Sequence, residues 1–222
     1  MKLRVAGLLF LFPLLAGLLC AQSDPAALSG RIEGHTYYSP TGAYRITIPV
    51  LRELGGTVND TDNVVTFEDH FTVHISIATF PQDATQRWEL STRGIKDYLT
   101  VFFTDFVVPD FQRMVPAISI ESITFLPKTQ GGALIAYTLL PGGSMFGDRP
   151  TIDGDTRGHV AKRGNLLFVR DGFIYVISTE LAERITEGTS YHKTTAEEDQ
   201  FLKDHLMDIL SKMTFMKPAA AQ

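Results

Sequence analysis

The segment PTIDGDTRGHV, residues 150–160, gathers two aspartates, an arginine and a histidine around two glycines. A calcium loop of the helix-loop-helix type requires oxygen ligands at positions 1, 3 and 5, glycine at position 6 and a bidentate glutamate at position 12. Counted from Asp153, position 5 is Arg157 and position 12 is Gly164, which excludes a calcium loop of this type. An aspartate followed by glycine favours a plain turn. The other interpretation is a looser metal site with the ligands Asp153, Asp155 and His159.

Two other patterns resemble chemical motifs and lack a required feature. His70 and His74 are four residues apart, a spacing that brings two metal ligands together on a helix. The surrounding HFTVHISIAT alternates between polar and apolar residues, which predicts a strand on which four residues span about 13 Å. The two histidines are therefore expected on a solvated face. Ser144 in PGGSMFG resembles a nucleophile elbow, but Phe146 stands where that motif requires glycine.

The first 21 residues have the three-part pattern of a secretory signal peptide. Lys2 and Arg4 form a basic start, and an apolar run follows over residues 5–19. Leu19 and Ala21 then occupy the two specificity positions of a cleavage site. Because the run is shorter than the ~20 residues of a membrane-spanning helix, we expect cleavage rather than anchoring. The mature chain is expected in the periplasm or outside the cell, with no membrane span.

Cys20, the only cysteine in the chain, raises the alternative of a lipid anchor. The cysteine that ends a bacterial lipoprotein signal follows a small residue, and here the preceding residue is Leu19. This difference favours cleavage after Ala21 over lipidation. The mature chain would then contain no cysteine, and its stability would depend on its core alone.

The composition, with 44% hydrophobic and 20% charged residues, is that of an ordinary globular domain. Without Lys2 and Arg4 the mature chain has 18 basic and 25 acidic residues, a net charge of −7. The sequence has no basic patch, which argues against nucleic acid and anionic membranes as partners. We expect a linker over residues 22–35, a single domain over 36–217 and a tail over 218–222.

Strand patterns dominate the predicted domain. Short apolar or alternating runs predict strands over residues 43–48, 64–67, 70–79, 118–126, 133–140 and 213–216. Glu121-Ser122 marks a predicted bulge, because the parity of the apolar residues changes there. Asp171-Gly172 between two apolar runs predicts a hairpin of strands 165–169 and 173–179. These two strands are apolar at nearly every position, so both of their faces should be covered.

Apolar residues at spacings of three and four predict a helix over residues 91–106. Pro109 is expected to end this helix, because proline cannot donate the backbone hydrogen bond that a helix interior needs. Trp88, the only tryptophan, lies just before the helix and is interpreted as a packing anchor.

A second helix is expected near the end of the chain. Its capping box is formed either by Thr194 with Glu197 or by Thr195 with Glu198. The predicted fold class is therefore α+β: an antiparallel β-sheet packed by two main helices, in an α/β/α sandwich.

The order of these elements resembles the PsbP-like superfamily, named for an extrinsic subunit of photosystem II. Three stretches carry the resemblance, SPTGAYRITIP, LLFVRDGFIYVIST and FLKDHLMDILSKMTF, and together they span roughly residues 36–216. The resemblance implies a PsbP-like fold and a non-enzymatic accessory or binding function, as in a group with many exported members. No stretch of this sequence carries a motif for the photosystem role.

The leading hypothesis is an exported, non-catalytic binding domain that contacts another extracytoplasmic protein, with the loop Pro141–Thr156 as its contact surface. No catalytic residue, cofactor-binding residue or cofactor is predicted. The alternative from a different class is a metal-assisted hydrolase, which requires Asp153, Asp155 and His159 to share a pocket with one of the two strand histidines. A third hypothesis, a small-ligand carrier, requires an apolar cavity between sheet and helices. The oligomeric state and the identity of the partner are left open.

Overall fold

The computed structural model describes residues 28–71, 73–145, 160–181 and 183–216. Within these residues, antiparallel strands form a seven-stranded sheet in the order β4-β5-β6-β10-β9-β8-β7. In chain order its members are β4 (Thr57–Asp60), β5 (Val64–Glu68), β6 (His74–Pro81), β7 (Ser119–Leu126), β8 (Ala133–Pro141), β9 (Val160–Arg170) and β10 (Phe173–Glu180). A smaller sheet consists of β1 (Arg31–Glu33), β2 (Thr36–Tyr38), β3 (Tyr44–Thr47) and β11 (Met213–Phe215).

The helical segments fall into two groups along the chain. The first group is α1 (Ala84–Arg93), α2 (Ile95–Phe102), a π-helical turn (Phe103–Val107) and α3 (Val108–Met114). The second is α4 (Glu183–Thr186) and α5 (Thr195–Lys212). Short 3-10 turns lie at Arg52–Leu54 and Gly188–Ser190.

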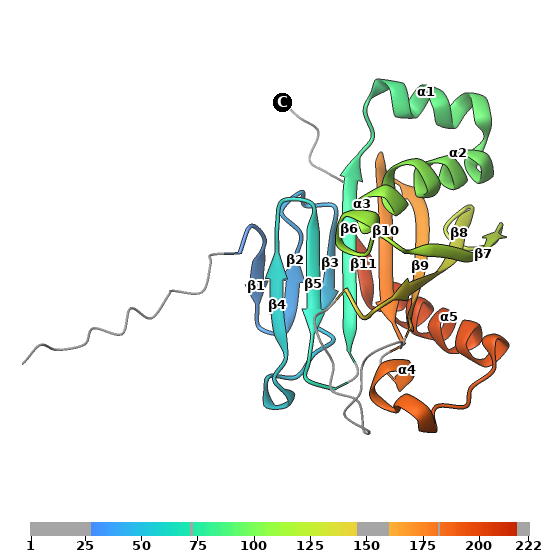
Figure 1. The fold of residues 1–222 in the computed structure, drawn as a ribbon. Coiled ribbons are helices and arrows are strands. Elements are labelled where there is room, and N and C mark those ends of the chain that lie inside the picture. Colours follow the sequence, from blue (N-terminus) through green and yellow to red (C-terminus); the bar gives the residue numbers. More distant parts are fainter. Residues whose placement is uncertain (1–27, 72, 146–159, 182, 217–222) are drawn as a thin grey trace, which may run out of the picture.

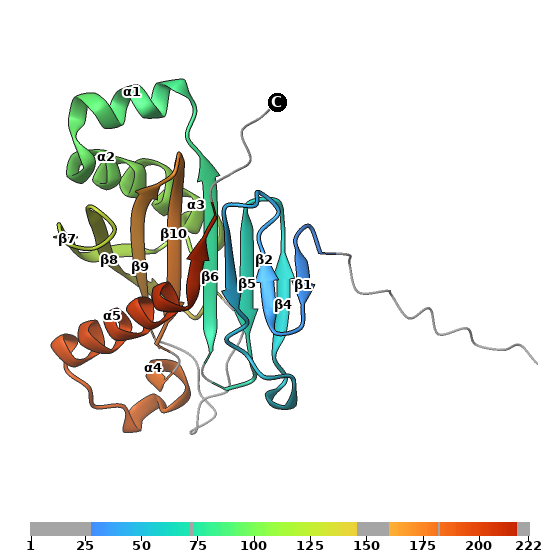
Figure 2. The same ribbon diagram turned by 180° about the vertical axis from the view of Figure 1, so that it is seen from behind.

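The seven-stranded sheet is the middle layer of the molecule. Figures 1 and 2 show α2 and α3 against one face of this sheet, and α5 with β11 and β3 against the other. Each face has its own cluster of buried apolar side chains, one shared with α2 and α3 and one shared with α5 and the small sheet. The predicted α+β class, with an antiparallel sheet between helices, is confirmed.

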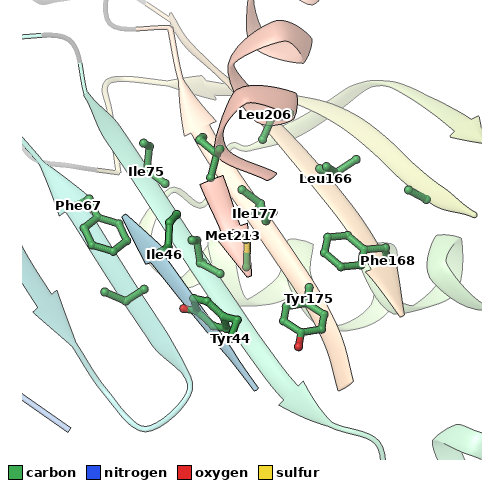
Figure 3. Close-up of a cluster of buried hydrophobic side chains, with 14 of the residues drawn as sticks. Tyr44, Ile46, Phe67, Ile75, Leu166, Phe168, Tyr175, Ile177, Leu206 and Met213 are labelled. Atoms are coloured by element: carbon green, nitrogen blue, oxygen red, sulfur yellow. The ribbon is translucent and has the colours of Figure 1, made fainter. Parts of the chain in front are cut away.

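The larger buried cluster joins the two sheets to α5 (Figure 3). Phe168 of β9 stacks on Tyr175 of β10 with 4.9 Å between ring centroids, and Phe215 of β11 meets both rings edge-on. Leu202 and Leu206 of α5 are fully buried against the same face. The covering of both faces of β9 and β10, expected from their continuous apolar sequence, is confirmed.

Two local predictions about the sheet are confirmed at the residue level. Asp171 and Gly172 connect β9 to β10, and both have positive φ, as a tight two-residue hairpin turn requires. The register between β7 and β8 shifts between Ile120 and Ser122, so Glu121 is the extra residue of a bulge. The paired strands are longer than predicted, because β9 begins at Val160.

The first helical segment differs from its prediction at Pro109. The chain does not end its helix there but continues through the π-helical turn into α3, which runs to Met114. The amide of Val108 bonds the carbonyl of Phe103, five residues back, and Pro109 lies in the first turn of α3. Proline is tolerated in a first turn, since its missing N–H is not needed there.

Trp88 was expected to be a packing anchor, and this prediction is wrong. Its side chain is 65% exposed on α1. No residue of α1 is buried. The helix is held at its start by a capping box between Asp83 and Gln86 instead.

The predicted strand over residues 70–79 starts later than expected. β6 begins at His74, and Phe71, which lies before the strand, is 57% exposed. His70 is exposed, whereas His74 is only 1% exposed, so the prediction of a solvated histidine face is wrong for His74. Alternation along a strand does not tell how far each position is covered: His74 at the start of β6 is buried, whereas Ser76 and Ala78 on the same face are half-buried.

Both chain ends of the described domain are held by the small sheet. β1, which lies inside the segment predicted as a linker, pairs with β2, and Asp60 accepts hydrogen bonds from the amides of Ser29 and Gly30. At the other end, the predicted capping box of Thr194 with Glu197 is present at the start of α5. The predicted last strand is also present, as β11, which pairs with β3.

Candidate binding groove

The residues singled out from the sequence as possible metal ligands, Asp153, Asp155 and His159, lie outside the described residues. The metal-assisted hydrolase therefore stays a prediction. Within the described ranges, no three His, Cys, Asp or Glu side chains are arranged to hold a metal ion. Ser144 donates a hydrogen bond to the carboxylate of Glu180. The proposed contact loop Pro141–Thr156 is described only as far as Met145.

The described structure contains a groove of about 790 Å³ between the first helical group and the central sheet. Its helical wall comes from the end of α2, the π-helical turn and α3, and Gln86 of α1 also lines it. Its floor is the face of β5, β6 and β10 on the same side, and Met145 lies at its edge. The apolar lining residues are Val64, Ala78, Phe80, Phe102, Phe106, Val107, Pro109, Phe111, Met114, Met145 and Val176.

The groove exists because the helices cover only part of the sheet. Residues of α2 and α3 pack over β8, β9 and β10. In Figure 1 no described helix covers β4 or β5. The side chains of β5 and β6 on this face, among them Thr66, Ser76 and Ala78, are accordingly only half-buried.

The rim of the groove exposes large apolar side chains. Phe106 of the π-helical turn is 59% exposed and Met114 at the end of α3 is 64% exposed. Phe106 stacks on Phe102 with 5.5 Å between ring centroids, which fixes one face of its ring. Single exposed apolar residues are common on proteins, but two at the rim of one apolar groove indicate a binding surface.

A row of polar side chains crosses the floor. Thr66 lies opposite Ser76, Ser76 opposite Ser178, and Ser178 opposite Asn165, so the row runs over β5, β6, β10 and β9. Ser178 donates to the side-chain oxygen of Asn165 at 2.8 Å. The Asn165 amide nitrogen is bonded to the carbonyl of Ala136 at 3.2 Å. Each group in the row is thus held in place by a neighbour.

A buried ion pair closes the end of the floor beside Ser76. Arg163 is 3% exposed and contacts Glu180 at 3.1 Å, while its other terminal nitrogen donates to Ser76 at 2.7 Å. Glu180 also accepts from the amide of Met145. Burial lowers the pKa of Arg163 from its usual value, and Glu180 opposes that change. The guanidinium remains charged, since arginine titrates far above neutral pH.

The rim of the groove is acidic. Among the lining residues, Arg113 pairs with Asp110 at 2.8 Å, and Arg163 pairs with Glu180. Glu68 and Asp105 also line the groove, and neither forms an ion pair with any described residue. The carboxylates at the groove are therefore in excess over its cations.

The opposite face of β9 carries a second charged cluster. Lys162 is fully buried and pairs with Glu121, Glu198 and Asp199. Burial alone would lower the pKa of Lys162, but hydrogen bonds to Asp199, Glu121 and Glu198 outweigh it, so the pKa is raised. Arg184 and the hydroxyl of Tyr191 also bond Glu198, each at 2.9 Å. Because its cations pair with carboxylates from different elements, this cluster ties α5 to β9 and β7.

The sequence matches no protein-family profile and no curated protein. Solved structures to which the fold is similar include PsbP from the cyanobacterium Synechocystis sp. PCC 6803, at 12% identity and a TM-score of 0.47, covering 87% of this chain and 100% of that one. They also include the Ran-binding protein Mog1p of Saccharomyces cerevisiae, at 10% identity and a TM-score of 0.43, covering 85% of this chain and 96% of that one. PsbP is thus among the similar folds, as the sequence resemblance predicted.

A crystal structure from Bacteroides thetaiotaomicron is similar at 11% identity and a TM-score of 0.40, covering 84% of this chain. This chain spans half the length of that protein. At these identities the similarity concerns the fold alone. Among the described residues, no helix has the length and apolar character needed to cross a membrane.

The residues of the groove were not found as a site from the sequence. Phe106 was predicted on the apolar face of the helix but is 59% exposed, and Ser76 belongs to an alternation in which Ile75 and Ile77 are buried as predicted. Nothing in either pattern indicates that one end of the helix face and the polar side of the strand meet at the same opening. The sequence did not predict a cavity; it showed only that a ligand carrier would need one between sheet and helices. The groove lies between the sheet and the helices.

Proposed function

We propose that this chain is an exported, non-catalytic binding domain that contacts another extracytoplasmic protein through the groove. The observation that carries the proposal is the pair of exposed apolar side chains, Phe106 and Met114, at the rim of an opening of about 790 Å³. Aromatic residues and methionine are enriched at protein interfaces and dominate their binding energy when they fill a pocket. The fixed polar groups of the floor supply hydrogen-bonding sites that give a partner its orientation.

The export part of the proposal rests on the first 21 residues and has its own test. We expect the mature protein, isolated from its natural host, to begin at Gln22. The molecular mass of the intact protein and of its first tryptic peptide measures this directly. An amino-terminal peptide that starts at a lipid-modified Cys20, or one that retains Met1, would contradict it.

The contact with a partner is tested by crosslinking the tagged protein in its host and identifying captured proteins by mass spectrometry. We expect one extracytoplasmic protein to be captured repeatedly by the unmodified chain. Phe106→Asp combined with Met114→Asp should reduce its recovery by about tenfold or more, since a charge in the centre of an apolar contact leaves an unpaired group.

The matched control is Trp88→Asp, because Trp88 is as exposed as Met114 and is not among the groove-lining residues, although Gln86 of the same helix is. This variant should capture the same partner at the level of the unmodified chain. Equal losses from Trp88→Asp and from the double variant, or no reproducible partner at all, would sink the proposal. Circular dichroism of each variant confirms that the comparison is made between folded proteins.

A small-ligand carrier is the second candidate, and the size of the groove favours it. Small-molecule sites enclose roughly 300–1,000 Å³, and the groove of about 790 Å³ falls in this range. Native mass spectrometry of the protein from its host tests this function. A bound molecule that is lost in Phe106→Asp would support the carrier, and an unliganded mass under gentle conditions would count against it.

A further inference from the structure

The hydrogen bonds of the groove floor determine which groups it can offer to an occupant. Arg163 can only donate, so the oxygen of Ser76 accepts its hydrogen bond at 2.7 Å. The hydroxyl proton of Ser76 has no acceptor among the described residues. Ser76 is half-buried and lines the groove, so this proton is available to a carbonyl oxygen that enters.

The neighbouring hydroxyls in the row, those of Ser178 and Thr66, already donate their protons within the protein. The Asn165 amide nitrogen donates to protein oxygens, so its side-chain oxygen must accept and Ser178 must donate to it. Thr66 donates to the carbonyl of Asn59 at 3.2 Å. Thr66 is half-buried and lines the groove, so its hydroxyl oxygen keeps a lone pair for a donor from outside, whereas Ser178 is only 1% exposed and is not counted as such an acceptor. One donor beside one acceptor matches the C=O and N–H groups of an extended peptide better than a carboxylate, which only accepts.

The charges at the groove also disfavour an anionic occupant. Arg113 and Arg163 are already paired, whereas Glu68 and Asp105 are not. The mature chain as a whole has a net charge of −7. A basic occupant is therefore attracted to the opening, and an acidic one is repelled.

We infer that the occupant is a basic–apolar peptide segment of the partner, bound in an extended conformation. An apolar side chain of the segment lies against Phe106 and Met114, a backbone carbonyl accepts from Ser76, and a Lys or Arg side chain pairs with Glu68 or Asp105. This inference rests on the proposed function, because it names the chemistry of the partner that the groove contacts.

Three capped heptapeptides, acetylated and amidated, test the inference with the purified mature protein. The first alternates leucine with lysine, the second leucine with glutamate, and the third serine with lysine. Titrations followed by backbone amide chemical shifts give each dissociation constant and the residues affected. We expect the leucine–lysine peptide to bind at least about tenfold more tightly than either of the others, with the largest shifts at the groove.

Two sets of variants measure how much the groove carboxylates and the Ser76 hydroxyl each contribute to the affinity for the peptide. Glu68→Gln with Asp105→Asn should weaken binding of the leucine–lysine peptide about three- to tenfold at low salt, and the difference should shrink as salt is added. The control with the same loss of charge is Glu53→Gln with Asp62→Asn, two exposed residues outside the groove lining. It should leave the affinity within about twofold of the unmodified protein, as expected for charges remote from the contact.

Ser76→Ala removes the donor and should weaken the leucine–lysine peptide about fivefold. Ser76→Thr keeps a hydroxyl and should restore most of that loss, which a merely structural role of the hydroxyl in packing would not predict. The urea midpoint of each variant is measured alongside to separate binding from stability.

The inference is overturned if the leucine–glutamate peptide binds as tightly as the leucine–lysine peptide, if neither binds, or if Ser76→Ala leaves the affinity unchanged. These results can be distinguished from a failure of the proposed function. If a partner is captured through Phe106 and Met114 but the peptides do not bind in the expected order, the groove is still the interface, and the bound segment has a different chemistry. Loss of groove-dependent capture would overturn both.

Discussion

Lys162→Met lowers the free energy of unfolding by about 3–5 kcal/mol at pH 7, the range measured when one partner of a buried ion pair is removed. Lys162 is fully buried and contacts the carboxylates of Glu121, Glu198 and Asp199. Methionine has a similar shape but no charge, so three carboxylates would be left close together with only Arg184 as a cation. Urea denaturation followed by circular dichroism measures the change.

The loss in the Lys162→Met variant should become smaller as the pH falls from 7 towards 4. Carboxylates crowded without their cation bind protons more readily in the folded state than in the unfolded state, and such groups gain folded stability as the pH decreases. Lys212→Met is the control, because Lys212 pairs with Asp208 on the surface, where its side chain is 42% exposed. That variant should differ from the unmodified protein by less than about 1 kcal/mol. Equal losses in both variants would contradict the role assigned to the buried cluster.

Phe168→Ala should cost about 3–5 kcal/mol, as for other fully buried phenylalanines. The ring of Phe168 is completely buried, stacks on Tyr175 and meets Phe215 edge-on. Its loss would leave a cavity where β9, β10 and β11 meet, at the junction of the two sheets. The measurement is the urea midpoint combined with the slope of the transition.

Phe71→Ala makes the same chemical change at a position that is 57% exposed. It should alter the free energy of unfolding by no more than about 0.5 kcal/mol. A comparable loss from Phe71→Ala and Phe168→Ala would mean that the joined core of the two sheets does not carry the stability of the domain.

The central strands were predicted well because each has a strong local signal. The apolar runs 166–169 in β9 and 173–177 in β10 are separated by Arg170-Asp171-Gly172, so the pairing of these two strands follows from the sequence alone. The bulge at Glu121 follows from the change of parity on either side of it. By contrast, β4 and β1 are short strands without a continuous apolar run, and they form only because neighbouring strands offer them a partner.

The first helical segment shows where a local rule failed. Pro109 does prevent a regular hydrogen bond in a helix interior. The π-helical turn before it shifts the bonding pattern by one residue, and Pro109 then falls in the first turn of α3. The extra turn places Phe111 and Met114 along the groove. Pro109 was predicted to end the helix, but it lies in the first turn of a further helix that supplies part of the candidate site.

The groove could not be predicted because its existence depends on what the helices leave uncovered. The alternation in β6 correctly separates Ile75 and Ile77 from Ser76. It does not tell which part of the polar side faces an opening and which part is buried, and His74 was misassigned for that reason. The placement of α2 and α3 over β8, β9 and β10 is a tertiary property of the whole chain.

The most direct test of the groove as the binding surface places a photocrosslinking amino acid at Met114 or at Trp88 in the tagged chain, expressed in its host. The two side chains are 64% and 65% exposed, so accessibility alone would give equal yields. If the groove contacts the partner, a single protein is captured from position 114 and little or none from position 88. Equal capture from both positions, or capture from position 88 alone, would contradict the account.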